Sequence, residues 1–586
     1  MPSPYGPAHD SLAQDSTANL TTAGEKYPPR SSFATTMAPQ KSRRTLWWVL
    51  AAIAAVAVIL GAVLGGVLGS RAAKDNKKSN VATAQDGASS SSSKSSSAAS
   101  STTKTSTSTS SSASASATAA GPLVNIVDLP AWNWGQNKSI GVCGGSWLIL
   151  EKWMLPDWFN ETVNAVSPGA GATVMDEWGL CETLGQDRCR EALTQHWDTW
   201  ITESDFDTMV EYGINHFRLP TGFWAWIPTI EGEPYINDTA LYQAQIEKIL
   251  GWAYDRGMYV LIDAHGLPGS QNGEQSSGQL TKTPSWFGGS AATETPNQLR
   301  SDAMVVAMTE FLARTPYRSV VTGLEVINEP RPYTDDQVVQ LQNYYERSYQ
   351  TIQNSAWPVA TFLADGYTNL TFFRDFASAH ATEPPSMVMV DHPYPGNFPP
   401  QTNSADILQQ VCSAADRYLN YPIPVCIDEW SLYTGVKDQA FEKTFYEQQL
   451  ATWAWSAGGM YWSWRLDTSQ EDLAKGIDYS QYSFITLLRN NTKTIPKPSD
   501  YGITDTTTGS AAEAYLSAIA ADLSSSCGAA PDNVAPFAST PFPTWTAEVN
   551  ARSSAQGKTL TATSTVTSAT TTGTARRQKR AVPLAF

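Results

Sequence analysis

Between about residues 122 and 530, short apolar runs alternate with longer segments in which apolar residues recur at helical spacing. Eight of the runs are rich in β-branched and aromatic residues and are bounded by turn-forming residues, as expected of buried parallel strands. They cover residues 139–150, 214–222, 258–266, 323–330, 359–366, 386–395, 424–431 and 458–466. Helical spacing separates them, for example over 190–213, 240–257 and 336–353. Eight strand–helix units in about 400 residues predict an α/β fold, a (β/α)8 TIM barrel with long loops.

In almost every unit the apolar run ends in a polar or aromatic residue. A TIM barrel builds its active site at the C-terminal ends of its strands, so these residues are candidates for one common site. They are Glu151, Arg218, His265, Asn328 with Glu329, Asp365, His392 with Tyr394, Glu429, and Trp462 or Trp464. A single strand-end glutamate is more often a surface carboxylate, and a single histidine or tryptophan is more often part of a core. The repetition of polar ends in consecutive units is what indicates a site.

Glu329 and Glu429 end the fourth and seventh predicted strands, which lie nearly opposite each other in an eight-stranded ring. Two facing carboxylates suit the cleavage of a glycosidic bond, because one protonates the leaving oxygen and the other acts on the anomeric carbon. A separation of about 5 to 5.5 Å would indicate retention of configuration, and a wider gap inversion. We expect Arg218 or His392 to keep Glu429 ionised, and burial beside that charge to raise the pKa of Glu329.

Composition favours a neutral carbohydrate ligand. The chain contains 21 tryptophans, and sugar rings pack on aromatic faces. Its net charge of −16 argues against nucleic acid as a partner, since phosphate binding needs clustered Lys and Arg. We expect no metal, nucleotide or redox cofactor, because glycine-rich phosphate loops and histidine clusters are missing from the sequence.

The flanks of the predicted barrel are of a different kind. Residues 1–45 lack periodicity and predict a disordered cytosolic tail. Residues 46–69 are uncharged and apolar, and at about 1.5 Å per residue they are long enough to cross roughly 30 Å of hydrocarbon as a signal anchor. Residues 70–120 form a Ser/Thr-rich linker suited to O-glycosylation. The catalytic domain is then expected over 121–530, followed by a low-complexity tail over 531–586.

Sequons and cysteines indicate the orientation of the predicted anchor, because Lys and Arg flank it on both sides. All six cysteines follow the anchor, and so do five Asn-x-Ser/Thr sequons, at Asn137, Asn160, Asn237, Asn369 and Asn490. We therefore expect a single-pass type II protein of the cell membrane with its catalytic domain on the cell-wall side. A further sequon at Asn19 lies on the other side. Lys579 and Arg580 are either a solvated charge cluster or a dibasic processing site.

The segments INEP (327–330) and DEWS (428–431) resemble those of the retaining glycosidases of glycoside hydrolase family five. Longer stretches are similar to the fungal exo-β-1,3-glucanases of that family, at 141–151, 196–206, 213–226 and 263–273. The resemblance implies Glu329 as acid/base and Glu429 as nucleophile. It also implies that Asn328 bonds the sugar 2-hydroxyl, that Glu151 contacts the terminal glucose and that Trp462 stacks beneath it. Around the nucleophile it implies Arg218, His265, His392 and Tyr394.

Two positions depart from the family pattern. Where yeast-type enzymes carry aromatic residues at the entrance of the cleft, this chain has Glu274 and Asn397. Phe398 and Trp286 are the candidate replacements, and the preference for a β-1,3-linked chain depends on them.

Six cysteines allow 15 pairings. Cys181 with Cys189, or Cys412 with Cys426, would close a short loop, which would leave Cys143 for Cys527. A metal–thiolate site is not expected, because no CxxC pair occurs.

We therefore expect a monomeric, membrane-anchored retaining glycosidase that releases glucose from the ends of cell-wall β-1,3-glucan, with transglycosylation as a side reaction. Another linkage, such as β-1,6-glucan or a glucosylated lipid, is the alternative within this class. A non-catalytic glucan-binding wall protein is the alternative outside it, although such a protein would not need both carboxylates.

Overall fold

The computed structural model describes residues 127–523, apart from 368–369, 420, 491–492 and 505–508, together with Cys527. The predicted cytosolic tail, anchor, linker and C-terminal tail (531–586) all lie outside the described residues. Within the described part, none of the helices combines the length and the apolar character needed to cross a bilayer.

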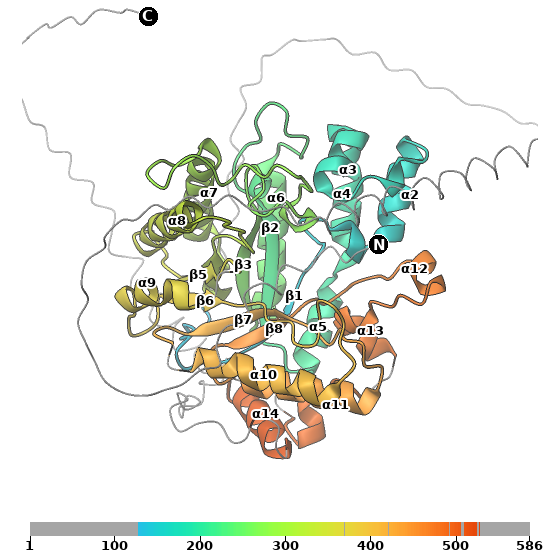
Figure 1. Ribbon diagram of the computed structural model, residues 1–586, viewed down its shortest axis with the longest axis vertical. Coiled ribbons are helices and arrows are strands. Elements are labelled where there is room, and N and C mark those ends of the chain that lie inside the picture. Colours follow the sequence, from blue (N-terminus) through green and yellow to red (C-terminus); the bar gives the residue numbers. More distant parts are fainter. Residues whose placement is uncertain are drawn as a thin grey trace, which may run out of the picture. The chain divides into compact units, whose positions relative to one another are not determined.

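Eight parallel strands close into a barrel in the order of the sequence, with β1 paired to both β2 and β8 (Figure 1). The strands are β1 (Ser139–Cys143), β2 (His216–Gly222), β3 (Tyr259–Gly266), β4 (Val321–Glu325), β5 (Ala360–Ala364), β6 (Met387–Val390), β7 (Val425–Trp430) and β8 (Gly458–Tyr461). Each falls in a predicted apolar run or begins within two residues of it. The predicted (β/α)8 barrel is confirmed.

Helices lie around the outside of these strands (Figure 1). They are α2 (Pro156–Val166), α3 (Glu177–Leu184), α4 (Gln186–Trp200), α5 (Glu203–Glu211), α6 (Thr239–Asp255), α7 (Pro296–Arg314), α8 (Asp335–Gln353), α9 (Arg374–Ala379), α10 (Ser404–Tyr418), α11 (Gln439–Trp453), α12 (Gln470–Ala474), α13 (Phe484–Arg489) and α14 (Gly509–Asp522). The helical pattern over 190–213 is two helices rather than one. Thr202 and Asp205 form a capping box that starts α5, because each side chain bonds the other's backbone N–H.

Every residue of all eight strands is buried, since one face of the sheet packs inside the barrel and the other packs against helices. Gly458 shows how tightly the ring closes. Its φ is +91°, and a Cβ atom there would lie 2.2 Å from the carbonyl oxygen of Ser139 in β1. Only glycine lets β8 begin this close to β1.

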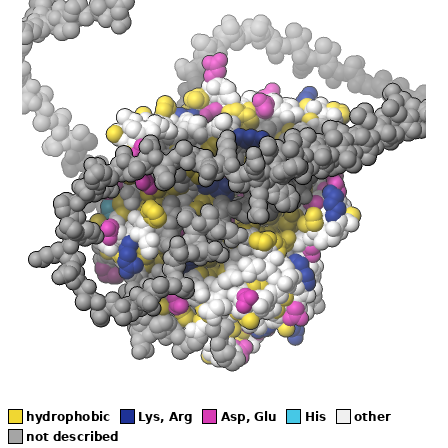
Figure 2. Space-filling model, in the orientation of Figure 1, with side chains coloured by type: hydrophobic (Ala, Val, Ile, Leu, Met, Phe, Trp, Pro, Cys, Tyr) yellow, Lys and Arg dark blue, Asp and Glu magenta, His cyan; other side chains and the backbone are white. Residues whose placement is uncertain are grey.

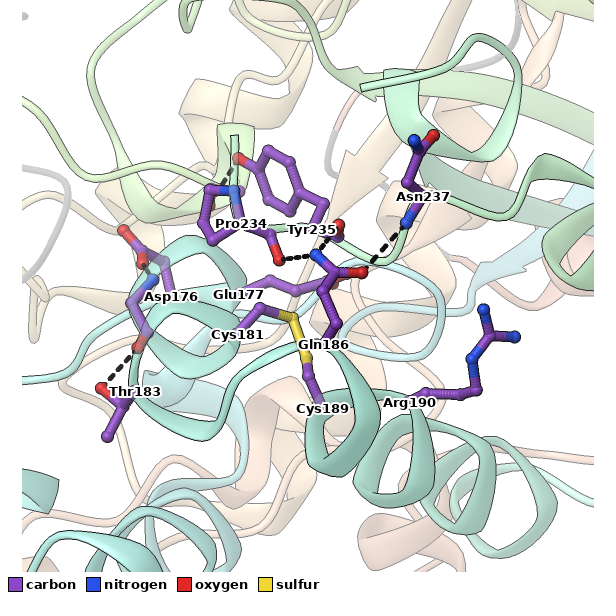
Figure 3. The surroundings of a disulfide bond; sticks show 12 residues. Asp176, Glu177, Cys181, Thr183, Gln186, Cys189, Arg190, Pro234, Tyr235 and Asn237 are labelled. Atoms are coloured by element: carbon purple, nitrogen blue, oxygen red, sulfur yellow. Dashed lines mark hydrogen bonds between the residues drawn. A yellow bond between two sulfur atoms is a disulfide. The ribbon is translucent and has the colours of Figure 1, made fainter. Parts of the chain in front are cut away.

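Two disulfides join the described cysteines. Cys181 and Cys189 link α3 to α4 (Figure 3), which confirms that pairing. Beside it, the Gln186 amide donates to the carbonyl oxygens of Pro234 and Tyr235 at 2.7 and 2.6 Å and so ties α4 to the connection after β2.

The second disulfide joins Cys412 to Cys527, so the expected alternatives Cys412–Cys426 and Cys143–Cys527 are wrong. Cys412 lies on α10, outside the barrel. Cys143 in β1 and Cys426 in β7, the two strands that flank β8, are buried free thiols, and the Cys143 thiol donates to the Asp428 carbonyl oxygen at 3.2 Å. Topology rather than loop length therefore decided the pairing.

On the part of the surface that Figure 2 shows and the structure describes, acidic and basic side chains are scattered among uncharged ones. This face presents no continuous basic surface of the kind that binds nucleic acid.

Candidate active site

The predicted site residues come together at the C-terminal ends of the strands. Glu151 follows β1, Arg218 and His265 lie in β2 and β3, and Asn328 and Glu329 follow β4. His392 and Tyr394 follow β6, Glu429 lies near the end of β7, and Trp462 follows β8. All nine are buried or nearly so.

Glu429 is held by two donors. Arg218 Nη1 donates to its Oε1 at 2.7 Å, and the Tyr394 hydroxyl donates to its Oε2 at 2.7 Å. These two bonds hold the carboxylate in one orientation, and only 2% of the residue is exposed. A carboxylate oriented in this position can act as a nucleophile.

Glu329 lies across from Glu429. An oxygen of each carboxylate lies within 4.8 Å of an oxygen of the other, a separation that fits a retaining pair. Glu329 Oε1 accepts a hydrogen bond from His392 Nδ1 at 3.0 Å. Its Oε2 is buried without a hydrogen-bond partner among the described residues, so this oxygen is free to meet a leaving group. Glu329 also has a φ of +44°, the kind of backbone strain that gathers at active sites.

The expected rise in the pKa of Glu329 is wrong for the substrate-free protein. Burial does raise this pKa, but the hydrogen bond and the positive charge of His392, with contributions from Tyr367 and Arg331, outweigh burial and lower it to about 2. The group that decides the charge of Glu329 is thus His392 rather than Glu429.

His392 stands between three carboxylates. Its Nε2 lies 2.8 Å from Asp428 Oδ1, and its Nδ1 lies 3.6 Å from Glu429 Oε2 in addition to the bond with Glu329. Burial lowers the pKa of His392, but the charge of Glu429 and the hydrogen bonds to Asp428 and Glu329 raise it well above its ordinary value. The sequence reasoning missed Asp428, although it directly precedes Glu429 in the DEWS segment.

Arg218 is the centre of a second buried cluster. Its guanidinium contacts Glu325 at 2.8 Å, Asp263 at 3.0 Å and Asp428 at 3.3 Å, and it donates to Asn328 Oδ1 at 2.7 Å. Burial raises the pKa of Glu325 well above its ordinary value, which keeps this carboxyl neutral. Asp263 and Glu325 were also missed, because Asp263 lies inside β3 and Glu325, which ends β4, lies inside the longer apolar run predicted over 323–330.

One side of the site offers open polar groups above an aromatic ring. His265 Nδ1 bonds Asp263 at 2.7 Å, while His265 Nε2 and Glu151 Oε1, 3.8 Å apart, are both buried without a partner among the described residues. The Trp462 ring lies parallel to the His265 ring at 5.5 Å. Burial raises the pKa of Glu151 to about 7. Such groups are suited to sugar hydroxyls over a stacking face.

Two strand-end candidates remain. Trp464 lies away from this constellation, stacked on Phe484 in the core. Asp365 lines a cavity of about 30 Å³ together with Glu329 and His392 and accepts a bond from the Tyr367 backbone N–H. Burial, followed by the charge of Asp391, raises the pKa of Asp365 to about 7.

Ligand atoms of Glu329, His392 and Glu429 lie close enough together to hold one metal ion. His392, however, has a carboxyl oxygen within 3.0 Å of each ring nitrogen, so both nitrogens are already engaged in hydrogen bonds within the protein. The arrangement suits proton transfer better than metal ligation.

Comparison with known proteins agrees with this geometry. Residues 185–468 match the family model described as cellulase, glycosyl hydrolase family 5. Glucan 1,3-beta-glucosidase 1 of Schizosaccharomyces pombe is 30% identical over 362 residues, which cover 57% of this chain and 84% of that protein. The chain belongs to glycoside hydrolase family 5.

Further comparisons add detail to the membership in family 5. The probable glucan 1,3-beta-glucosidase A of Neosartorya fischeri is 34% identical over 295 residues, which cover 50% of this chain and 64% of that protein. The crystal structure of rutinosidase from Aspergillus niger covers 58% of this chain and 93% of its own, with a TM-score of 0.51 and 23% identity. That likeness shows the shared fold.

The entrance of this family 5 enzyme carries an ion pair at one of the departures noted above. Glu274 accepts from Arg331 Nη1 at 2.7 Å, and the Arg331 guanidinium lies 5.0 Å from the centre of the Tyr367 ring. Trp286 is fully buried and bonds Ser301, so it does not replace an entrance aromatic.

At the other departure, Asn397 donates to the Tyr482 hydroxyl. Phe398 packs edge-on against Tyr394 at 5.6 Å and is only partly buried, so it remains the candidate replacement.

Proposed function

We propose that this chain is a retaining glucosidase that hydrolyses terminal β-1,3-glucosidic bonds, with Glu329 as acid/base and Glu429 as nucleophile. The observation that carries the proposal is the carboxylate pair itself. The two carboxylates have oxygens within 4.8 Å of each other, Glu429 accepts a hydrogen bond on each of its oxygens, and Glu329 Oε2 has no hydrogen-bond partner among the described residues.

The residues divide the reaction into two steps. In the first, a Glu429 oxygen attacks the anomeric carbon while Glu329 gives its proton to the departing glycosidic oxygen. In the second, Glu329 takes a proton from water, whose oxygen attacks the same carbon and releases Glu429. Arg218 and Tyr394 hold the nucleophile in place, and Asn328, bound to Arg218, leaves its amide N–H groups for the sugar 2-hydroxyl.

The substrate part of the proposal has its own support. The similar proteins of S. pombe and N. fischeri are named glucan 1,3-beta-glucosidases. The open groups of Glu151 and His265 beside Trp462 suit the hydroxyls and the face of a terminal glucose. Transfer of glucose to a second sugar instead of water follows the same two steps.

The charged entrance favours one second candidate, a glucosidase for another linkage such as β-1,6-glucan or a glucosylated lipid. The Glu274–Arg331 ion pair stands where the resemblance expects a stacking aromatic, so the acceptor sugar meets hydrogen-bonding groups there. Rates on linkage-defined glucose disaccharides separate the two candidates.

We further propose that the chain is a monomeric type II membrane protein, anchored by 46–69 and held from the membrane by 70–120, with 121–530 on the cell-wall side. The apolar run, the two disulfides and the exposed sequon at Asn237 support this location. Asn137 is buried and bonds the Asn133 backbone, so we expect no glycan there. Deglycosylation should shift the mobility of the wild type by one glycan more than that of Asn237→Gln; equal shifts would refute glycosylation at Asn237.

Proton NMR of the reaction tests the central proposal. The soluble segment 121–530 is mixed with laminari-oligosaccharides, and the anomeric signal of the first glucose released is followed. We expect β-glucose from the wild type and no glucose from Glu429→Ala. Release of α-glucose would refute the retaining mechanism. Cleavage of no glucoside, together with unchanged glucan binding by Glu429→Gln, would indicate a binding protein instead.

A further inference from the structure

Asp428 contacts neither the expected position of the sugar nor the reacting carboxyl oxygens, yet it bonds the residue that controls Glu329. It lies in β7, directly before Glu429, and is fully buried. Its Oδ1 lies 2.8 Å from His392 Nε2, and the opposite nitrogen of the same ring lies 3.0 Å from Glu329 Oε1. Asp428, His392 and Glu329 thus form a continuous hydrogen-bonded line from strand β7 to the proposed acid/base.

When Asp428 and Glu329 are both ionised, this line places a proton on each nitrogen of the imidazole. An ionised carboxylate only accepts hydrogen bonds, so a ring nitrogen that faces one must donate. Asp428 is kept ionised because the Arg218 guanidinium lies 3.3 Å from its other oxygen and because neutral Glu325 bonds it. Although burial raises the pKa of Asp428, the charges of Arg218 and His392 lower it below its ordinary value.

Ionisable groups from several elements lie around His392. They are Asp428 and Glu429 from β7, Glu325 at the end of β4, Glu329 after β4, Asp365 after β5, and Asp391 and Tyr394 on its own segment after β6. Glu429 belongs to the proposed catalytic pair and also contacts Arg218, and Asp391 accepts from Tyr418 and Arg417. Asp428 is therefore the carboxylate outside the proposed catalytic pair that bonds this ring directly.

We propose that Asp428 is a positioning residue that keeps His392 protonated and thereby confines the acid/base work of Glu329 to acidic solution. The proposal rests on the proposed role of Glu329. A protonated His392 stabilises the Glu329 carboxylate, so the proton that the leaving group needs is held by Glu329 only at low pH. Removing the charge of Asp428 should let Glu329 keep its proton at higher pH.

The pH dependence of kcat/KM for two aryl β-glucosides tests this inference in wild type, Asp428→Asn and Asp391→Asn. Phenyl glucoside needs protonation of its leaving group, whereas 2,4-dinitrophenyl glucoside does not. For phenyl glucoside, kcat/KM of Asp428→Asn should fall at a pH about one unit or more above the pH at which that of the wild type falls. The reason is that an opposite charge at hydrogen-bond distance shifts a pKa by about 1 to 3 units. For dinitrophenyl glucoside, this fall should not move.

Asp391→Asn is the control. Asp391 directly precedes His392 in the chain, but its buried carboxylate bonds other residues, so the pH profile of this variant should match that of the wild type.

An unchanged phenyl glucoside profile in Asp428→Asn would overturn the inference, and so would an equal shift for both substrates, since the effect would then not pass through the acid. A second measurement does not depend on activity or on Asp428→Asn. Imidazole ¹⁵N NMR of the wild type should show a histidine still protonated on both nitrogens at pH 7.5 whose signals are absent from His392→Gln. A neutral His392 at that pH would refute the proposal. A protonated His392 in a protein that cleaves neither glucoside would instead refute the proposed function.

Discussion

Replacing the buried cation of the site, Arg218→Met, should destabilise the fold and abolish activity together. Arg218 is fully buried and contacts four carboxylates, those of Asp263, Glu325, Asp428 and Glu429. Methionine fills a similar volume but offers no positive charge and no donor. It therefore leaves ionised carboxylates buried without their partner, which typically costs about 3 to 5 kcal/mol.

Two features of the site keep the loss of stability in Arg218→Met from being larger. Glu325 is neutral because burial raises its pKa, and His392 continues to compensate Asp428. A matched control is Arg256→Met, which removes an ion pair with the exposed Glu203 and Asp207 and should cost about 0 to 1 kcal/mol.

Urea denaturation between pH 3 and pH 7 measures the effect. Despite burial, Arg218 and His392 lower the pKa of Asp428, so the wild type gains stability from this group above the unfolded pKa and loses it as the pH falls through the folded one. The difference between wild type and Arg218→Met should thus be largest at pH 7 and should shrink toward pH 3. A variant within 1 kcal/mol of the wild type at pH 7, or one that keeps its activity, would refute the account of Arg218 given above.

Three further outcomes are expected. Glu329→Ala should lower kcat/KM for phenyl glucoside by about 10²- to 10⁴-fold but leave that for dinitrophenyl glucoside nearly unchanged. Azide added to this variant should yield β-glucosyl azide, and an α product would contradict the assignment. Cys412→Ser should cost about 2 to 5 kcal/mol in urea denaturation because it opens a disulfide spanning 115 residues, whereas Cys143→Ala, at a free thiol, should cost less; equal losses would speak against the Cys412–Cys527 link. Burial raises the pKa of Glu177 to about 8, so the folded state holds this proton more tightly than the unfolded state does. The free energy of unfolding should therefore fall between about pH 4.5 and 8. Glu177→Gln should make this fall smaller, and an unchanged dependence on pH would refute the shift.

The eight strands could be predicted because parallel strands buried on both faces must be continuous apolar runs. Their C-terminal ends then pointed to the site, since side chains that follow such runs meet at one end of a barrel. The helical pattern over 190–213 did not show that two helices lie there, because helical periodicity continues across a break that the capping box of Thr202 and Asp205 marks. The disulfide of Cys412 could not be foreseen, because distance in the chain says nothing about which cysteines face the barrel interior.

Residue types and their order were enough to indicate a TIM barrel, a pair of carboxylates and the family, because all three depend on periodicity and on residues at strand ends. The charges within the site were decided only in three dimensions. Asp263, Glu325 and Asp428 look like ordinary strand residues until the barrel closes and brings them onto Arg218 and His392. Electrostatic energy depends on distance through a buried, poorly polarisable interior, and the packed barrel alone establishes those distances. For that reason His392 determines the charge of Glu329, although 63 positions separate the two in the chain.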